Sequence, residues 1–306
     1  MKQMFEIKND GTNKDIPKGM TIHEARQHYL DMYGSSFKSL MPDPMTLMQP
    51  YQDKWVFRAD LAPAGFKAFA AEKVIAECEK DVLVYVAPRV GHAPHAIAVL
   101  ANMYGKRCVF FAPSSKEVSN HQAVTLAHGA ELRFLRSPAM PTINIWAKRW
   151  AEENNAQYLP FGLSGMPSVT AGIVNLANRI PEPPEFWCAT STGTMIRGLQ
   201  IGWPNATPYS VAVSRNIKEG EVGRAIIESA TMPFLKPSKE LPDFPTTATY
   251  DAKAWTKFKE HAKPGAIFIN VGSDQAIESE IGSVNKKEVN SQREWGDMRD
   301  MSPLYS

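Results

Sequence analysis

The strongest constraint on this chain is a regular alternation of short apolar runs with longer segments of helical spacing. The first run, residues 82–87, is continuously apolar, which is typical of a strand buried on both faces. A helix over 94–103 should begin at Pro94 and stop at Gly105. Three βα units in succession predict an α/β fold with a parallel sheet. The later elements are a strand over 108–111, a helix near 117–128, a strand over 131–135 and a helix near 142–153.

The alternation resumes after an interruption rich in Gly and Pro at 160–167. Two groups of βα units are therefore expected, and ligands of such sheets bind in the crevice at the carboxyl ends of the strands. Residues 1–50 lack the pattern, although 21–33 has helical spacing, and a charged tail that begins near Glu278 is expected to be an arm or partly disordered. The resumed pattern predicts a helix near 168–179, a strand over 186–189, a helix from about 193, and strands over 209–213 and 266–271.

Composition excludes several classes of protein. Of the 306 residues, 43% are apolar and 22% are charged, which is ordinary for a globular protein. The 34 basic and 32 acidic residues give a formal charge of +2, too close to balance to imply a nucleic-acid or membrane partner. The odd number of cysteines predicts reduced core thiols. Without an apolar leader or a membrane-length apolar run, we expect a cytoplasmic protein.

A hydroxyl-rich loop follows the strand 186–189. It comprises Thr190, Ser191, Thr192, Gly193 and Thr194 and opens the next helix. A helix N-terminus offers backbone N–H donors and partial positive charge, and the glycine permits close approach, so the loop suits a phosphate. It lacks the lysine of a nucleotide-binding P-loop, which disfavours nucleotide triphosphate hydrolysis. The simpler interpretation, a Ser/Thr helix cap, stays open.

A second loop, 88–95, follows the strand 82–87 and carries Arg89, Gly91, His92 and His95. Two histidines bind a metal only with a third ligand, and no further His, Asp, Glu or Cys lies nearby in the sequence. We therefore expect no metal here. A capping or cofactor-stacking role for His92 is the preferred interpretation.

One lysine differs in position from the other lysines, most of which are expected to be solvated surface groups. Lys67 falls at the start of an alanine-rich helix from Ala68, after the strand and loop 55–66. The helix dipole is positive at this end, which is unfavourable for an ammonium group. A lowered amine pKa is what a Schiff-base lysine needs.

Together these segments resemble the fold type II family of pyridoxal-phosphate enzymes, nearest the branch of aminocyclopropane-carboxylate deaminase and D-cysteine desulfhydrase. Residues 56–61 with 65–67 are similar to the family's K-R-x-D-L and G-x-K elements, and 127–132 resembles its L-G-A-E-V step. The loop 190–194 resembles its phosphate loop. Residues 250–254 and 267–272 resemble the deaminase elements Y-E-G-K and L-F-x-x-T-G-G.

The resemblance implies two interleaved open parallel-sheet, Rossmann-like βα domains and pyridoxal phosphate as cofactor. It places Lys67 as the Schiff-base lysine, Tyr250 as an aid to proton transfer and Asp251 near the pyridine nitrogen. His92 then contacts the cofactor, and Arg89 and Gly91 contact the substrate. The expected division is an arm over 1–50, a large cofactor domain over 51–80 and 160–277, a small domain over 81–159 and a tail over 278–306. A homodimer is implied by the resemblance alone.

The sequence departs from the family at two positions of the loop 88–95 and also in the phosphate loop. His92 stands where the family has an asparagine against the ring hydroxyl, and Gly91 replaces the serine of the deaminase branch. The phosphate loop has one glycine instead of three, so that side-chain hydroxyls substitute for amides. The loss of the asparagine and the serine argues against the usual substrate of the branch.

Three functions remain open. The leading interpretation is a lyase or deaminase that forms a Schiff base with an amino substrate, with Lys67, Tyr250 and Asp251 as catalytic residues. The second is action, with or without decarboxylation, on an amino acid attached to a modified nucleobase in viral DNA, which would make nucleic acid a partner. The third is a relative that binds the ligand without chemistry, because a fold does not imply a function.

Overall fold

The computed structural model describes residues 13–114, 118–135, 139–214, 217, 220–230 and 233–286. The chain divides into two compact units. Unit 1 comprises 1–74 and 162–276, and unit 2 comprises 75–161 and 277–306. The chain therefore passes from unit 1 to unit 2, returns to unit 1 and enters unit 2 again at residue 277. Each unit has its own sheet.

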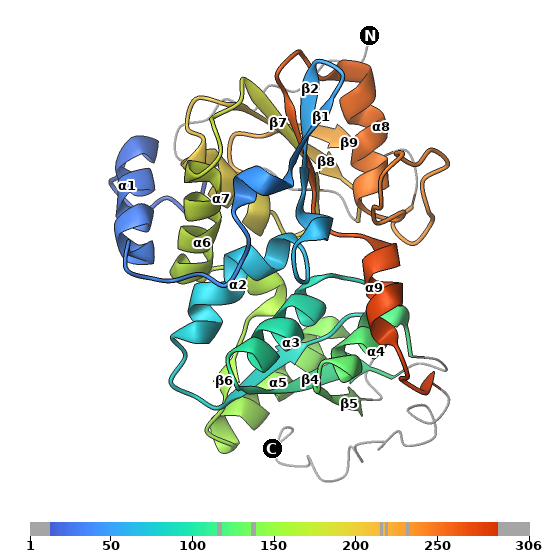
Figure 1. Ribbon diagram of the computed structural model, residues 1–306. Helices are drawn as coiled ribbons and strands as arrows, with labels where there is room; N and C mark the ends of the chain where they lie inside the picture. Colours follow the sequence, from blue (N-terminus) through green and yellow to red (C-terminus); the bar gives the residue numbers. More distant parts are fainter. Residues whose placement is uncertain are drawn as a thin grey trace. The chain divides into compact units, whose positions relative to one another are not determined.

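Unit 1 contains a six-stranded sheet in the order β1-β2-β10-β7-β8-β9 (Figure 1). All neighbouring strands are parallel except the β1–β2 hairpin. The central strand β7 is buried at every residue, as its continuous apolar run requires. The strands are β1 (Met48–Tyr51), β2 (Lys54–Arg58), β7 (Glu185–Thr190), β8 (Thr207–Ala212), β9 (Ile226–Ser229) and β10 (Ile267–Asn270).

Helices cover this sheet with two apolar clusters. Trp255 and Phe258 of α8 pack against Trp187 of β7 and Phe268 of β10. On α1, a Thr21 capping box starts a helix whose buried tyrosines pack with residues of α6 and α7. The helices of unit 1 are α1 (Ile22–Tyr33), α2 (Phe66–Ala76), which ends at the unit boundary, α6 (Pro167–Asn178), α7 (Thr194–Gly202), α8 (Asp251–His261) and the first residues of α9 (Asp274–Ile281).

Small residues allow the helices near the site to pack closely. A Cβ at Gly172 of α6 would lie 2.8 Å from the carbonyl oxygens of Phe69 and Ala70 in α2. A Cβ at Gly202 of α7 would lie 2.4 Å from the Cβ of Ala177 in α6. The positions of α2 and α7, whose first turns carry predicted site residues, are therefore set by close contact with α6.

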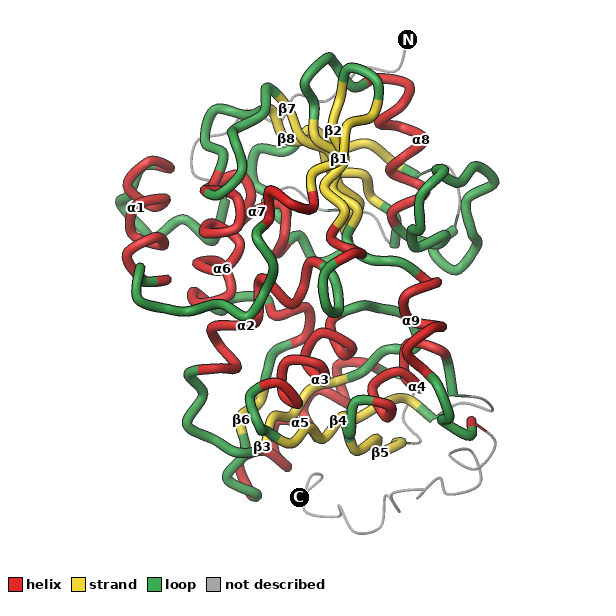
Figure 2. Tube along the Cα trace, viewed as in Figure 1, coloured by secondary structure: helices red, strands yellow, loops and turns green. Residues whose placement is uncertain are grey.

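Unit 2 contains a four-stranded parallel sheet in the order β5-β4-β3-β6, drawn in yellow in Figure 2. The first two residues of α3 are Ala93 and Pro94, and α5 packs Ile143 and Ala147 against Val84 and Val109 of the sheet. The elements of unit 2 are β3 (Val82–Val86), α3 (Ala93–Met103), β4 (Arg107–Pro113), α4 (Asn120–Ala127), β5 (Glu131–Leu135), α5 (Met140–Glu153) and β6 (Gln157–Tyr158). Of the 3-10 turns, Pro44–Leu47 and Ala59–Leu61 belong to unit 1, and Phe161–Leu163 lies at the unit boundary.

The two groups of βα units are confirmed, and the helix expected over 21–33 is observed as α1. Strands β1, β6 and β9 and helix α8 were not expected, because they are short or their helical periodicity is interrupted by charge. The expected tail begins inside α9, whose Ile277 and Ile281 are buried in unit 2. Residues 287–306, and 1–12 of the expected arm, lie outside the described residues, while 13–50 belong to unit 1.

All three cysteines are free, as predicted, with Cys108 and Cys188 buried and Cys78 half-buried. Among the described residues, no helix combines the length and the apolarity that a membrane span requires.

Close packing of α6 on α2 gives a test of the fold. We expect Gly172→Ala to lower the free energy of unfolding by about 1–3 kcal/mol, because the added methyl group overpacks a backbone contact. Denaturant unfolding of the full chain measures this change. Ser168→Ala, on a half-buried position of the same helix, should change stability by less than about 0.5 kcal/mol. Equal stability of both variants would contradict the contact.

Candidate functional site

Lys67 is the second residue of α2, and a connection that contains the 3-10 turn Ala59–Leu61 joins this helix to the carboxyl end of β2. The turn before it requires glycine, because Gly65 has φ 73° and a Cβ there would lie 2.4 Å from the carbonyl oxygen of Val271. That oxygen accepts a hydrogen bond from the Phe66 amide at 2.9 Å. The Lys67 side chain is half-buried, and its Nζ donates one long hydrogen bond, 3.4 Å, to the carbonyl oxygen of Gly162.

Burial lowers the pKa of the Lys67 amine to about 8, and the positive charge of the Arg197 guanidinium adds to this effect. The amine is therefore neutral and nucleophilic at a pH well below the range of a lysine in water, whose pKa is 10.5. This is the electrostatic setting that a lysine nucleophile needs. The pKa of Lys67 is lowered, as the position at a helix N-terminus predicts, but the main cause is burial and not the helix dipole.

The hydroxyl-rich loop joins β7 to α7. Thr190 ends β7, Gly193 is the N-cap of α7 and Thr194 is its first residue. Gly193 has φ 75°, and a Cβ there would lie 2.2 Å from the carbonyl oxygen of Glu221, so this position requires glycine. Ser214 donates a hydrogen bond from Oγ to Ser191 Oγ at 2.8 Å. The loop thus presents hydroxyl groups at a helix N-terminus, which suits an anion.

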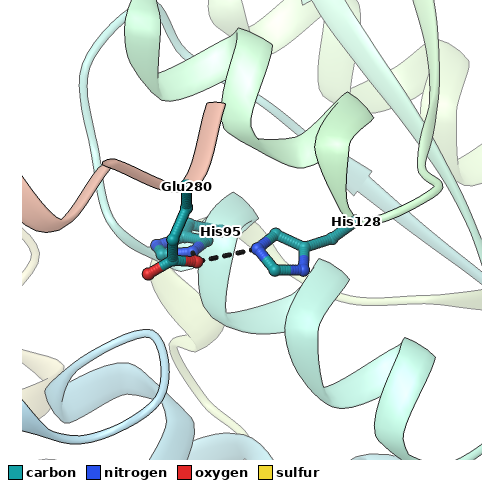
Figure 3. Close-up of side chains that lie close together, drawn as sticks. All are labelled: His95, His128 and Glu280. Carbon is teal, nitrogen blue, oxygen red and sulfur yellow. Dashed lines mark hydrogen bonds and ion pairs between the residues drawn. The ribbon is translucent and has the colours of Figure 1, made fainter. Parts of the chain in front are cut away.

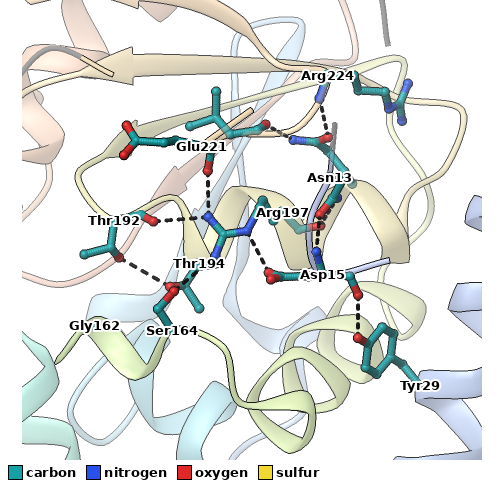
Figure 4. Close-up of polar contacts among 12 residues, drawn as sticks. Asn13, Asp15, Tyr29, Gly162, Ser164, Thr192, Thr194, Arg197, Glu221 and Arg224 are labelled. Carbon is teal, nitrogen blue, oxygen red and sulfur yellow. Dashed lines mark hydrogen bonds and ion pairs between the residues drawn. The ribbon is translucent and has the colours of Figure 1, made fainter. Parts of the chain in front are cut away.

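A buried arginine lies beneath this loop (Figure 4). Arg197 of α7 is fully buried; its Nη1 donates hydrogen bonds to the carbonyl oxygens of Thr192 at 3.1 Å and Glu221 at 2.6 Å. Its Nε pairs with Asp15 Oδ2 at 2.8 Å. Arg197 was not among the residues predicted from the sequence, although an arginine within an apolar helix is a signal in itself, since buried charges are rare unless paired.

Tyr250 and Asp251 lie at the start of α8, as its N-cap and first residue. Asp251 is fully buried, and its Oδ2 accepts a hydrogen bond from the Val271 amide at 3.1 Å. Its Oδ1 is buried without a hydrogen-bond partner among the described residues. Burial raises the pKa of Asp251 well above the usual range, and the carboxyl groups of Asp60 and Asp274 raise it further. The hydrogen bonds that the carboxyl group accepts from the backbone of Val271 and Gly272 lower the pKa in part.

The Tyr250 hydroxyl stays protonated because its pKa is raised. Burial raises its pKa, and the neighbouring Asp251 and Cys188 add to the effect. The Ser191 backbone, which hydrogen-bonds to this hydroxyl, lowers the pKa in part. Tyr250 therefore remains a proton donor at neutral pH, and it lies beside the hydroxyl-rich loop.

Two backbone positions bring the predicted residues of unit 1 together. The backbone of Val271 bonds through its oxygen to the residue before Lys67 and through its amide to Asp251. The carbonyl oxygen of Gly162 accepts from Lys67 Nζ, and a Cβ at Gly162 would lie 2.7 Å from the Thr192 side chain. The lysine amine, the hydroxyl-rich loop and the buried carboxyl group therefore surround one region of unit 1.

The other predicted site residues belong to unit 2. Arg89 is exposed, Gly91 is half-buried, and His92 is the N-cap of α3. The His92 ring lies edge-on to His121, with centroids 5.2 Å apart. Burial lowers the pKa of His92 well below the usual range, and His121 and His95 add to this effect, so the ring is neutral.

Comparison with known proteins gives matches among solved structures alone, since no family model and no curated protein matches the sequence. An aminocyclopropane-carboxylate (ACC) deaminase homologue is 15% identical with a TM-score of 0.63, over 76% of this chain and 89% of its own. A threonine deaminase from T.th. is 16% identical with a TM-score of 0.61, over 81% and 97%. Diaminopropionate ammonia lyase from Escherichia coli is 14% identical with a TM-score of 0.60, over 91% and 97%.

These similarities confirm the expected architecture. Deaminases, an ammonia lyase and a pyridoxal 5'-phosphate-dependent aspartate racemase share the fold, which is that of the fold type II pyridoxal-phosphate enzymes. At this level of identity the likeness establishes the fold, and the chemistry of the chain has to be argued from its own residues.

The lowered pKa of Lys67 predicts how the reaction rate of its amine depends on pH when no ligand is bound. Labelling of the cofactor-free protein with a trace of acetic anhydride, read by peptide mass spectrometry, should reach half of its maximal rate at Lys67 near pH 8. Below this pH the rate should fall by about tenfold per unit, because only the neutral amine reacts. A half-maximal rate near pH 10.5, as for a lysine in solution, would show that the amine is not desolvated.

Proposed function

We propose that this protein is a pyridoxal-phosphate-dependent enzyme that acts on an amino substrate by elimination or deamination. One observation carries the proposal. A lysine with a pKa lowered to about 8 lies next to a hydroxyl-lined helix N-terminus, in the unit that also buries a carboxyl oxygen without a partner among the described residues. The shared fold with deaminases and lyases supports the same chemistry.

The residues present fit this cofactor. The loop 190–194 would hold the phosphate, because it offers hydroxyl groups and a helix N-terminus above the buried Arg197. Asp251 would face the ring nitrogen, since no described residue bonds to its Oδ1 and a protonated ring nitrogen would do so. When bound, pyridoxal phosphate supplies an aldehyde that condenses with amines and a ring that withdraws electrons from the amino carbon.

The role of Lys67 follows from its pKa. As a neutral amine it would hold the cofactor covalently until a substrate amine replaces it, and its Nζ would then move a proton to or from the amino carbon of the substrate. An amine with a pKa close to the working pH can both accept and return that proton. A lysine fully protonated at neutral pH could not accept it.

Asp251 and Tyr250 would have two separate roles in the reaction. A cation beside Asp251 would reverse the effect of burial and favour its carboxylate, whose negative charge would in turn keep the ring nitrogen protonated. Tyr250 keeps its proton and lies beside Ser191, so it would donate to the leaving group or to the phosphate end of the site. Both roles use groups that are buried in unit 1, the unit that contains Lys67.

For the substrate, the proposal names a chemical class and not an individual compound. An amino acid is the substrate class expected from the deaminases and lyases that share the fold. His92, Arg89 and Gly91 of unit 2 remain predictions as cofactor-contacting and substrate-binding residues. A homodimer, a cytoplasmic location and a modified-base DNA substrate also remain predictions.

The first test maps the lysine. Addition of pyridoxal phosphate to the purified protein should give a visible absorbance band, and borohydride reduction should then fix the pyridoxyl group on Lys67. Lys67→Ala should abolish the band and the label and leave the melting temperature near that of the wild type, because Lys67 makes one long hydrogen bond in the fold.

Lys253 provides an internal comparison for this test. Burial lowers the pKa of its amine as well, but its Nζ donates to the carbonyl oxygens of Pro233 and Phe234, so it is already engaged. Label on Lys253, or label that persists in Lys67→Ala, would overturn the assignment. Turnover of a panel of small amino acids by the wild type, lost in Lys67→Ala, would establish an enzyme instead of a ligand-binding relative.

The second test concerns the phosphate loop. Thr192→Val removes one hydroxyl group at nearly constant volume and should weaken the binding of pyridoxal phosphate by about 10- to 100-fold, the value of one hydrogen bond to a charged group. Binding of pyridoxal, which has no phosphate, should stay unchanged. Thr256→Val on α8 is the control, since its hydroxyl bonds to the Ala252 carbonyl oxygen. Equal losses for both ligands would place Thr192 away from the phosphate.

A further inference from the structure

Three side chains of unit 2 converge at a place that the proposed function does not use (Figure 3). Nε2 of His95 and Nε2 of His128 both lie 2.8 Å from Oε2 of Glu280. His95 is 2% exposed, whereas the His128 and Glu280 side chains are 23% and 33% exposed. Two imidazole nitrogens and one carboxylate oxygen thus meet at a point that solvent can reach from one side.

Local structure positions these three ligands firmly. His95 is in the first turn of α3, and His128 is the C-cap of α4. Glu280 lies on α9 between Ile277 and Ile281, which are buried in an apolar cluster with residues of α4. A second contact, from Asn120 Nδ2 to Glu278 Oε1 at 3.1 Å, holds the same helix. Packing therefore determines which face of α9 is turned toward the two histidines, and Glu280 lies on that face.

The donor set is typical of one class of ion. Two histidines and a carboxylate are the protein ligands of many zinc sites with an open fourth position, and imidazole is a poor ligand for Mg²⁺ or Ca²⁺. With metal–ligand bonds of about 2.0–2.1 Å, ligands of a tetrahedral site lie about 3.3 Å apart. The three ligand atoms here lie within 4.8 Å of one another, so small side-chain rotations would admit an ion.

We propose that His95, His128 and Glu280 form a binding site for a transition-metal ion of the Zn²⁺ class, with water as the fourth ligand. The site departs from the expectation of no metal, which considered His92 with His95 and found no third ligand nearby in the sequence. The missing ligand is Glu280, 185 positions after His95. The bound ion joins α3, α4 and α9 within unit 2 and stabilises that unit.

The proposal is independent of the cofactor site, because all three ligands belong to unit 2 and Lys67, Asp251 and the hydroxyl-rich loop belong to unit 1. Metal binding can therefore be measured on protein without pyridoxal phosphate. A failure of either proposal leaves the other unaffected.

The experiment uses the full chain after removal of metals with a chelator. Calorimetric titration with Zn²⁺ should give one equivalent with micromolar or tighter affinity, and Co²⁺ should give the visible spectrum of a tetrahedral site. Glu280→Gln and His128→Ala should each weaken Zn²⁺ binding by more than about tenfold, since even the loss of a group that only orients a ligand costs that much.

His261→Ala is the matched control. His261 also pairs with a glutamate, Glu260, at 3.5 Å on an exposed helix end, but no second histidine of the described residues joins that pair. This variant should bind Zn²⁺ like the wild type. Absence of stoichiometric binding by the wild type at submillimolar Zn²⁺, or equal binding by His128→Ala and the wild type, would overturn the proposal.

A thermal measurement separates metal binding from misfolding. Without metal, both ligand variants should melt cooperatively, and His128→Ala carries the test if Glu280→Gln does not fold. Zn²⁺ should raise the melting temperature of the wild type and of His261→Ala but not that of His128→Ala. A rise of the same size in His128→Ala would show that the ion acts elsewhere on the chain.

Discussion

The parallel register of three strands in unit 1 determines where its candidate chemistry lies. Arg58 at the end of β2 pairs with Asn270 at the end of β10, and Ile269 pairs with Cys188 of β7. The three strands therefore have their carboxyl ends at the same end of the sheet. The segments that carry Lys67, Asp251 and the hydroxyl-rich loop all contact residues at that end. A change of register by one residue would exchange the faces of the side chains and separate these groups.

A buried polar network holds the carboxyl ends of β2 and β10 in place. Arg58 and Asp60 form a two-pronged ion pair at 2.8 and 2.7 Å, and Asn270 donates to Asp60 Oδ1 at 2.6 Å. Thr246 in turn donates to Asn270 Oδ1, which ties the segment that leads into Asp251 to the sheet. Buried charges are costly unless they are paired and hydrogen-bonded, and here each is. The network holds the carboxyl group of Asp60 close to Asp251, where it adds to the effect of burial and raises the pKa of Asp251 further.

The sequence predicted the parts of the fold that are encoded locally. Apolar runs such as that of β3 and the glycine and proline signals around α3 identified both groups of βα units. Helix α8 was missed because its first turn, from Asp251 to Lys253, is polar in sequence but buried in the fold. The roles of Val271 and Gly162 were also beyond prediction, because each acts through a backbone carbonyl oxygen. Sequence patterns describe side chains, and much of this site is arranged by main chain.

Arg197 and Glu280 illustrate the same limit for charged side chains. Arg197 differs from its neighbours as a charged residue in an apolar helix, whereas Glu280 is an ordinary residue of α9. Each acquires its role from a partner far away in the sequence: Asp15 for Arg197, and His95 for Glu280. Glu280 lies in the segment expected to be a charged tail, and the burial of Ile277 and Ile281 directs it toward unit 2. A ligand set assembled in this way has no spacing that a motif could detect, so the search for metal sites has to begin from the folded contacts.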